Sequence, residues 1–242
     1  MKNNLSINPE IITALKHNQP VVALESAVLT HGLPRPVNLE MAAAVESAIR
    51  AEGAVPAAIG LLAGRIVVGM TRQEQEELSA AVGARKISRR DLALATSRGL
   101  YGGTTVAGTL IIARMAGLRV FATGGIGGVH RNAPFDVSAD LQELSRNPLV
   151  VVCAGAKAIL DLPATFEVLE SLGVPVTAYQ SDILPAFYSR ESGLPAPMRC
   201  DHPAEIASLA RAQWHLGLDN AILVTNPPPV EAALPFAQVE RA

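Results

Sequence analysis

The amino-acid sequence predicts an α/β protein, a three-layer α/β/α single domain over residues 1–242 with a mostly parallel, mixed central sheet. Short apolar runs alternate with segments of helical period, which is the order expected of βα units. The length of 242 residues suffices for one large core, and no internal repeat or linker divides it. We therefore expect ligands to gather at the carboxyl ends of the strands.

Apolar runs and helix signals set the expected elements in order. Strands are expected within residues 21–26, 56–70, 119–125, 148–155, 175–180 and 220–226. Helices are expected within residues 38–53, 71–83, 88–99, 165–173 and 203–218. Thr71 with Glu74, and Ser88 with Asp91, have the spacing of capping boxes, so two of these helices have defined starts. Lys86 is then expected in the turn before a helix.

Composition and charge exclude several classes of function. Only 17% of the residues are charged and the net charge is −2, so neither nucleic acid nor an anionic membrane is an expected partner. No apolar run reaches the roughly 18 residues of a membrane helix. Cys153 and Cys200 form no C-x-x-C motif, and the N-terminus lacks an apolar signal core. We expect a soluble, cytoplasmic protein that acts on a small molecule.

Two glycine-rich segments follow predicted strands. The first has the Gly103-to-Gly108 spacing of a P-loop but carries Thr109 where the lysine belongs. The second, GGIGGVH, has His130 where a dinucleotide fingerprint has its last glycine. Both nucleotide motifs therefore fail. Two interpretations remain open: the loops cradle an oxyanion through free amides and hydroxyls, or the glycines only serve tight turns.

Two carboxylates lie close together in the segment FDVSAD. Asp136 and Asp140 are hard oxygen ligands that could hold Mg²⁺ or Mn²⁺ together with waters. Zinc is disfavoured, because no Cys or His ligand spacing is present. The alternative is that Asp136 or Ser138 caps the helix that begins at ADLQEL, and the two carboxylates could also divide these roles.

Glu25 and Lys157 each follow a buried strand. A half-desolvated carboxylate has a raised pKa, which suits a general acid, and a buried amine has a lowered pKa, which suits a nucleophile. Lys157 is one of only four lysines, and arginine could not replace it because arginine stays protonated. The alternatives are a structural glutamate bonded to backbone amides and an ordinary surface lysine.

Eight motifs in fixed order resemble the pseudouridine-5′-phosphate glycosidase family, also called the indigoidine synthase A-like family. They are ALESAVLTHGLPRP, KISRRDL, GGTTVAGT, FATGGIGGVHR, DVSADL, VVVCAGAKAILDLPAT, FYSRESG and LVTNP. The resemblance covers about residues 20–227. It is far more specific than a single glycine loop.

The resemblance implies reversible cleavage of the C–C glycosidic bond of pseudouridine 5′-phosphate to uracil and ribose 5-phosphate. Such an enzyme of pseudouridine catabolism is a glycosidase by name and a carbon-oxygen lyase by class. The resemblance also implies that the protein uses Mn²⁺ or another divalent cation such as Mg²⁺ and that it forms a homotrimer. By position, Lys157 would form a Schiff base with C1′ of the ring-opened sugar, Glu25 would donate and accept the proton at the uracil carbon, and Asp136 would hold the metal. Substrate-binding positions would be Lys86, Val106, Ser138, Ala139, Asp140, His130 and Asn226.

The sequence departs from the family pattern in three places. Pro-Pro-Val replaces Ile-Pro-Glu after Asn-Pro, the spacing from His130 to Asp136 is two residues shorter than usual, and the chain is apparently short at the C-terminus. The alternative function is therefore a C-terminally truncated, inactive relative that acts as a binding or assembly protein. An enzyme that uses the same imine chemistry on another phosphosugar is a further alternative, and a nucleotide-binding domain is disfavoured by the failed motifs.

Overall fold

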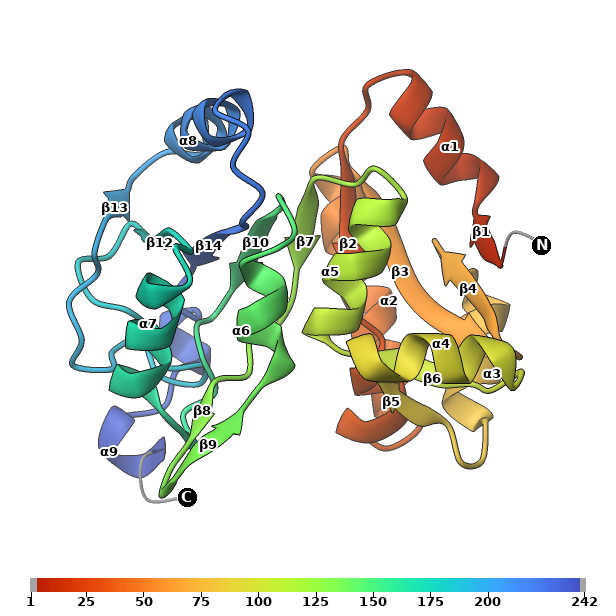
Figure 1. Cartoon of the computed structure of the whole chain (residues 1–242), viewed down its shortest axis with the longest axis horizontal. Coiled ribbons are helices and arrows are strands. Elements are labelled where there is room, and N and C mark those ends of the chain that lie inside the picture. Colours follow the sequence, from red (N-terminus) through yellow and green to blue (C-terminus); the bar gives the residue numbers. More distant parts are fainter. Residues whose placement is uncertain (1–3, 240–242) are drawn as a thin grey trace. The chain divides into compact units, whose positions relative to one another are not determined.

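The computed structural model describes residues 4–239. The chain divides into two compact units, residues 1–121 and residues 122–242 (Figure 1). Each unit has a sheet whose strands alternate with helices along the chain, so the predicted α/β class is confirmed. The single domain over residues 1–242 stays a prediction.

The first unit is built on one long strand, β3. Its strands are β1 (Leu5–Ile7), β2 (Val21–Leu24), β3 (Val55–Leu62), β4 (Arg65–Val68), β5 (Arg85–Ile87) and β6 (Gly102–Thr104), and β7 (Val120–Ala122) lies at the boundary of the units. β2 pairs parallel with the first half of β3, whereas β4 and β6 pair antiparallel with its second half. β1 is parallel to β4, and β5 is parallel to β6. The sheet is therefore mixed.

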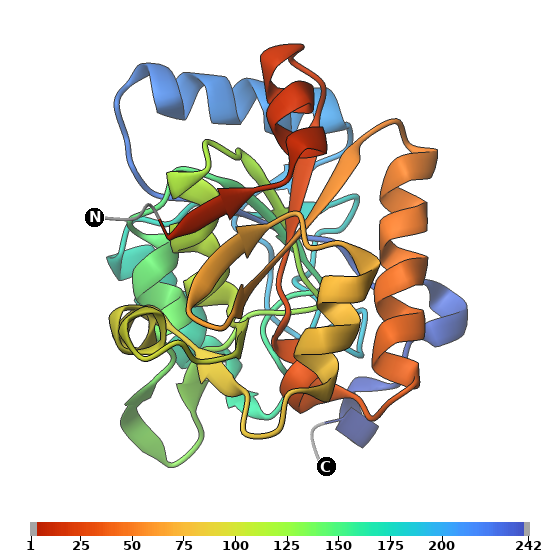
Figure 2. The ribbon, with the colours of Figure 1, turned by 90° about the vertical axis from the view of Figure 1, so that its right-hand side faces the viewer.

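Helices cover both faces of this sheet. They are α1 (Pro9–Lys16), the π-helical turn η1 (Val28–Gly32), α2 (Val37–Ala51), α3 (Arg72–Ala80), α4 (Arg89–Ser97) and α5 (Val106–Met115). α2 and α3 pack together on one side of β3, and α4 and α5 lie on the other (Figure 2). The predicted capping box of Thr71 and Glu74 starts α3, and Asp91 accepts from the Ser88 backbone at the start of α4.

The second unit has a parallel sheet and a small antiparallel one. The parallel strands are β10 (Val150–Cys153), β12 (Val176–Tyr179), β13 (Arg199–Cys200) and β14 (Ile222–Thr225), in the order β10-β14-β12-β13. The antiparallel strands are β8 (Val129–His130), β9 (Ala133–Val137) and β11 (Leu160–Asp161), with β8 in the middle. The helices are α6 (Ala139–Leu144), α7 (Leu162–Ser171), α8 (Pro203–His215), η2 (Val230–Ala232) and α9 (Phe236–Val239).

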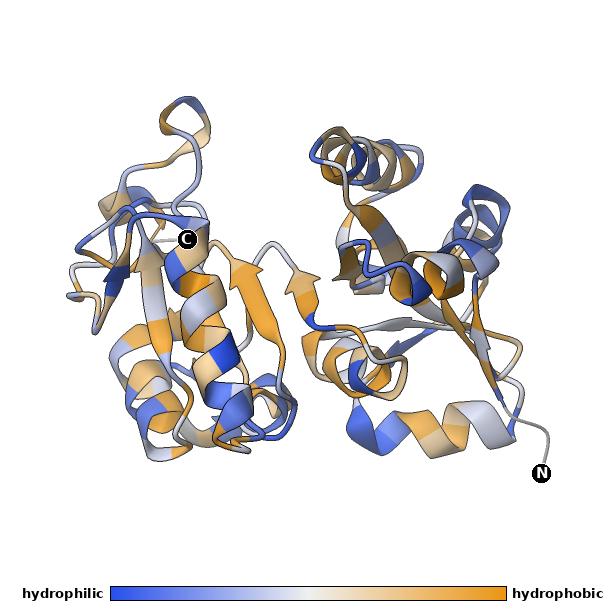
Figure 3. Cartoon of the chain, turned by 90° about the horizontal axis from the view of Figure 1, so that it is seen from above, coloured by the Kyte–Doolittle hydropathy of each residue, from blue (hydrophilic) through white to orange (hydrophobic). Residues whose placement is uncertain are grey.

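Apolar residues gather along the strands and the inward helix faces of each unit (Figure 3). In the first unit Leu39, Leu62 and Leu78 are among the buried residues of one cluster. In the second unit Ala210 of α8 packs with Ile222 and Val224 of β14. Among the described residues, no helix is both long and apolar enough to cross a bilayer.

The run of residues 56–70, which we expected to be strand, folds as a hairpin of β3 and β4. Ala63 and Gly64 form its turn, and both have positive φ angles, of 47° and 77°. A side chain on Gly64 would meet the backbone of Thr96 and Gly99. The turn reverses the chain within a run in which Arg65 is the only charged residue, so hydrophobicity alone did not reveal it.

Candidate functional site

In the first unit, two strands meet end to end beside Glu25. β2 ends with Leu24 opposite Ala58 of β3, and β6 pairs antiparallel with the next part of β3, Gly60 being opposite Gly103. The carboxyl ends of β2 and β6 therefore face each other along one edge of β3. Glu25 is the first residue after β2, and its side chain is partly buried, as the sequence predicts.

A buried hydroxyl network holds this junction together. Ser26 Oγ donates to Ile59 O at 2.5 Å and accepts from Thr104 N at 3.0 Å. Thr104 Oγ1 also donates to Ile59 O, at 2.8 Å, and accepts from Thr109 Oγ1 at 2.9 Å. Ser26, Thr104 and Thr109 are fully buried. The backbone next to Glu25 is thus fixed by hydrogen bonds that water does not reach.

Lys86 and Val106 both lie next to β6, Lys86 on the paired strand β5 and Val106 just after β6 in the chain. Lys86 pairs with Gly103 across the β5–β6 ladder, so it lies in a strand and not in the expected turn. Its side chain is exposed. Val106 is the first residue of α5, whose cap is Thr105. First-turn amides have no partner within their own helix, so this position suits the predicted backbone contact with a ligand.

The glycines of residues 102–108 allow close packing. A side chain on Gly102 would overlap Ile87, one on Gly103 would overlap Thr30 Oγ1, and one on Gly108 would lie 2.5 Å from Ile87 O. Gly102 and Gly103 lie in β6 and Gly108 lies in α5. Of our two interpretations, the one in which these glycines only serve tight turns does not hold, because close packing requires them; the oxyanion cradle stays a prediction.

In the second unit, Lys157 lies four residues after β10 ends at Cys153. Its backbone N–H donates to Ile126 O at 3.2 Å, and its carbonyl accepts from Leu160 N at 3.0 Å. Its side chain is exposed, although Ala156 and Ala158 on either side are buried. The expectation that burial activates this amine is therefore wrong, because a loop carries the lysine away from the buried strand.

Asn226 comes directly after β14, which lies beside β10. Its backbone N–H donates to Cys153 O at 2.8 Å, and Cys153 is opposite Thr225 in the ladder. The last residues of two parallel strands therefore bring Asn226 next to the segment that leads to Lys157. Asn226 and the segment that leads to Lys157 thus lie at the carboxyl edge of this sheet, and a ligand at this edge stays a prediction.

The segment Ser138, Ala139 and Asp140 begins α6. Ser138 accepts from Asp140 N at 3.2 Å and so caps the helix, as one of our two alternatives predicts. Asp140 is buried, and its Oδ2 accepts from Gly127 N at 2.9 Å. Asp140 thereby ties the glycine loop of residues 124–128 to the start of α6, and its expected contact with substrate stays a prediction.

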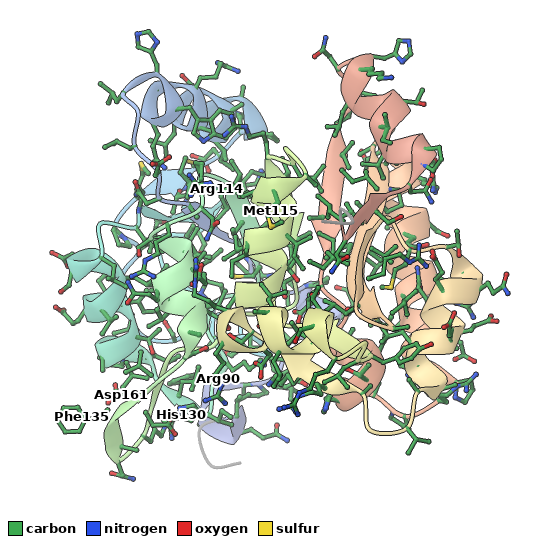
Figure 4. All side chains as sticks on the ribbon, turned by 45° about the vertical axis from the view of Figure 1, so that its right-hand side comes forward. Arg90, Arg114, Met115, His130, Phe135 and Asp161 are labelled. Atoms are coloured by element: carbon green, nitrogen blue, oxygen red, sulfur yellow. The ribbon has the colours of Figure 1, made fainter. Side chains whose placement is uncertain are left out.

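His130 and Asp136 face each other across the hairpin of β8 and β9. His130 Nδ1 lies 3.0 Å from Asp136 O and 3.4 Å from Asp136 Oδ2. Figure 4 shows His130 near Asp161 of the neighbouring strand β11, with Phe135 projecting from β9. Phe135 is 99% exposed. The hairpin thus brings together two residues that the sequence placed six positions apart.

The possible metal ligands at Asp136 suit a cation whose other ligands are mostly water molecules. Its carboxylate is 68% exposed, with the His130 ring beside it. Within residues 4–239 there is no group of three or more His, Cys, Asp and Glu side chains that could hold a metal. Mn²⁺ and Mg²⁺ accept one or two carboxylates and several waters. Asp136 therefore fits a hydrated divalent cation, whereas a closed protein cage does not fit.

Sequence reasoning missed two residues that anchor these segments. Ser26 carries no motif of its own, and its role depends on Ile59 and Thr104, which are distant in the sequence. Arg131 follows His130 in the hairpin turn and donates to backbone carbonyls beyond Lys157. The sequence signals are that each is adjacent to a predicted site residue and lies within one of the eight motifs.

Comparison with known proteins identifies the family. Residues 10–242 match the family model described as indigoidine synthase A like protein. The pseudouridine-5′-phosphate glycosidase of Paracoccus denitrificans is 56% identical over 239 residues, which are 97% of this chain and 79% of that protein. Two crystal structures share the fold.

One is an indigoidine synthase A-like protein of Thermotoga maritima, with a TM-score of 0.91 and 35% identity over 98% of this chain and 78% of that one. The other is the prealnumycin C-glycosynthase AlnA in complex with ribulose 5-phosphate, with a TM-score of 0.93 and 42% identity over 100% of this chain and 79% of that one. This chain belongs to the indigoidine synthase A-like family.

Proposed function

We propose that this protein is an enzyme that reversibly cleaves the C–C glycosidic bond of pseudouridine 5′-phosphate, releasing uracil and ribose 5-phosphate. The observation that carries the proposal is the 56% identity with a pseudouridine-5′-phosphate glycosidase over 97% of the chain. The family match over residues 10–242 includes all the predicted site residues, which lie between Glu25 and Asn226. Identity over nearly the whole chain argues against the alternative, an inactive relative.

A second relative supports both the phosphorylated sugar and the C–C glycosidic bond of the proposed substrate. The prealnumycin enzyme is named a C-glycosynthase, and its structure contains ribulose 5-phosphate. A synthase of C-glycosides forms the kind of bond that the proposed reaction breaks. This chain shares its fold with a protein whose structure contains a pentose phosphate. The likeness therefore favours a phosphorylated pentose as the sugar part of the substrate.

The C–C bond explains why a lysine is needed. No leaving oxygen is available for protonation, so the paired carboxylates of ordinary glycosidases are insufficient. In our proposal the neutral Lys157 amine bonds to C1′ as the C1′–O4′ bond breaks, and one amine proton passes to O4′, so the nitrogen again has a lone pair. The nitrogen lone pair then forms a C=N bond as the C1′–uracil bond breaks. Water adds to the iminium, the proton set free returns to the Glu25 carboxylate, and ribose 5-phosphate and the neutral amine are released.

Glu25 supplies the proton in this scheme. It protonates the uracil carbon, and the electron pair of the breaking bond returns to the pyrimidine ring, so uracil leaves neutral. In the reverse direction Glu25 removes the same proton. A partly buried carboxyl group on a fixed backbone suits both roles, because its proton must be aimed at a single carbon atom.

The remaining predicted residues would bind the substrate. Lys86 and the first-turn amides at Val106 offer positive charge and N–H donors, which suit a phosphate. Asn226 offers an amide that could pair with uracil. Asp136, with His130 nearby, would hold a hydrated divalent cation, whose charge would help to neutralise the phosphate. The homotrimer and the cytoplasmic location stay predictions.

Uracil release tests the proposal. Folded protein is incubated with pseudouridine 5′-phosphate, with and without Mn²⁺, and uracil is separated and quantified. We expect uracil and ribose 5-phosphate in equal amounts, and synthesis of the substrate when both products are supplied. A folded sample that releases no uracil under any of these conditions would favour the inactive relative, and activity only on another phosphosugar would favour that substrate.

A further inference from the structure

Arg131 holds the turn that follows Lys157. It lies with Asn132 in the two-residue turn between β8 and β9. Its Nε donates to Leu160 O at 3.1 Å, and one terminal nitrogen donates to Ala158 O at 2.9 Å. One guanidinium group therefore binds two carbonyls on alternate residues of the segment that begins with Lys157.

The same turn is fixed from its other side. Lys157 N donates to Ile126 O, and Leu160 N donates to Lys157 O. Ala158 and Leu160 are buried, at 4% and 2% exposure, whereas Ile159 is 61% exposed. Buried side chains and hydrogen bonds thus fix every second residue of the turn, and the lysine side chain extends from a fixed backbone.

We infer that Arg131 is a positioning residue for Lys157: its guanidinium clamps the 158–160 backbone and so fixes the point from which the amine reaches the sugar carbon. This inference rests on the proposed function, in which Lys157 attacks C1′. A lysine side chain has many rotamers, so only a fixed Cα keeps its amine within reach of one carbon atom. A misplacement of about 1 Å in a reacting group can lower a rate roughly 100-fold.

The geometry of the clamp requires arginine. A guanidinium group presents several N–H donors in a rigid fork, so it can bind two carbonyls at fixed spacing. A lysine ammonium at this position has a similar charge but no fork. Arg131→Lys therefore keeps the positive charge and removes the paired donors, and Arg131→Met removes both.

The test measures imine formation and turnover separately. Each variant is mixed with ribose 5-phosphate and borohydride, the rate of adduct formation at Lys157 is followed by mass spectrometry, and kcat and KM are measured with pseudouridine 5′-phosphate. We expect Arg131→Lys to lower the trapping rate and kcat by roughly 10- to 100-fold and to leave KM nearly unchanged. Amide hydrogen exchange at Leu160 should become faster.

Chemical rescue separates positioning from a general loss of structure. Guanidinium ion, added well below the concentration that unfolds the protein, should restore part of the kcat of Arg131→Met, and methylammonium should not. Arg72→Lys is the matched control, because Arg72 also donates to a backbone carbonyl, that of Leu39 at 2.8 Å, in the first unit. It should leave trapping and kcat unchanged.

The outcomes distinguish this inference from the proposed function. An active wild type with trapping rates and kcat unchanged in Arg131→Lys and Arg131→Met would overturn the inference alone. A fall in kcat that Arg72→Lys reproduces, without rescue by guanidinium, would also overturn it. A folded wild type that neither releases uracil nor forms the adduct would overturn the proposed function and the inference together.

Discussion

The segments that carry Glu25 and Lys157 are held in different ways. Next to Glu25, fully buried hydroxyls of Ser26 and Thr104 share the carbonyl of Ile59. Beyond Lys157, an arginine reaches from a hairpin turn to the backbone carbonyls of two buried residues, Ala158 and Leu160. An anchor buried in the sheet contributes to folding as well as to the site, whereas a clamp near the surface can affect the site with less effect on stability.

Substitutions of Glu25 and Lys157 should have the largest effects on activity, and they should distinguish the proton donor from the nucleophile. Glu25→Gln should lower uracil release by about 10²–10⁴-fold, the range for loss of a general acid, yet keep the borohydride adduct with ribose 5-phosphate. Lys157→Ala should lose both. Thermal unfolding of each variant checks that it is folded. An adduct lost in Glu25→Gln but kept in Lys157→Ala would reverse the assignment.

The next largest effect is on stability, and it tests the buried hydroxyl network around Ser26. Ser26→Ala removes the hydroxyl that serves Ile59 O and Thr104 N, and we expect the free energy of unfolding to fall by about 1–3 kcal/mol. For a chain of this size each kcal/mol lowers Tm by roughly 2–4 °C. Ser97→Ala is the control, since its exposed hydroxyl also bonds a carbonyl, that of Leu94. Equal Tm values for both variants would contradict the account.

Much of the fold was predictable from the sequence because its signals are local. Apolar runs located β2, β10, β12 and β14, and the spacing of Thr71 with Glu74 marked the start of α3. The strands β5 and β6 were missed because three residues each, two of them glycines in β6, carry no periodic pattern.

The candidate site was predictable as residue types at strand ends, but its geometry was not. The pairing of His130 with Asp136 depends on the hairpin register, which contains an irregularity between Val129 and His130. The exposure of Lys157 depends on a loop that leaves the strand. The anchors were missed since their partners are backbone atoms far away in sequence, which no residue pattern reports.

A glycine in the second unit gives a comparable test of close packing. A side chain on Gly127 would overlap Ser138 Oγ and lie 2.9 Å from Asp140 Oδ2, whereas one on Gly124 would meet only Phe187, at 3.4 Å. Gly127→Ala should lower the free energy of unfolding by about 1–3 kcal/mol, and Gly124→Ala should change it little. Denaturant unfolding measures both. Similar free energies of unfolding for the two variants would show that the loop at Gly127 is not closely packed against Ser138 and Asp140.

The smallest effect concerns a thiol near the end of β10. Burial raises the pKa of Cys153 from about 9 to about 12. Between these values the unfolded chain loses the thiol proton and the folded chain keeps it, so stability should fall as pH rises through this window. Cys153→Ala should show a weaker fall in Tm over the same range. An identical pH profile in both proteins would contradict the burial of this thiol.

The position of the trapped sugar shows which lysine forms the imine. Wild-type protein is treated with ribose 5-phosphate and borohydride, digested, and mapped by mass spectrometry. We predict that the added mass lies on Lys157 and is absent from Lys86, the other lysine among the predicted site residues. An adduct on Lys86, or one that survives Lys157→Ala unchanged, would contradict the account.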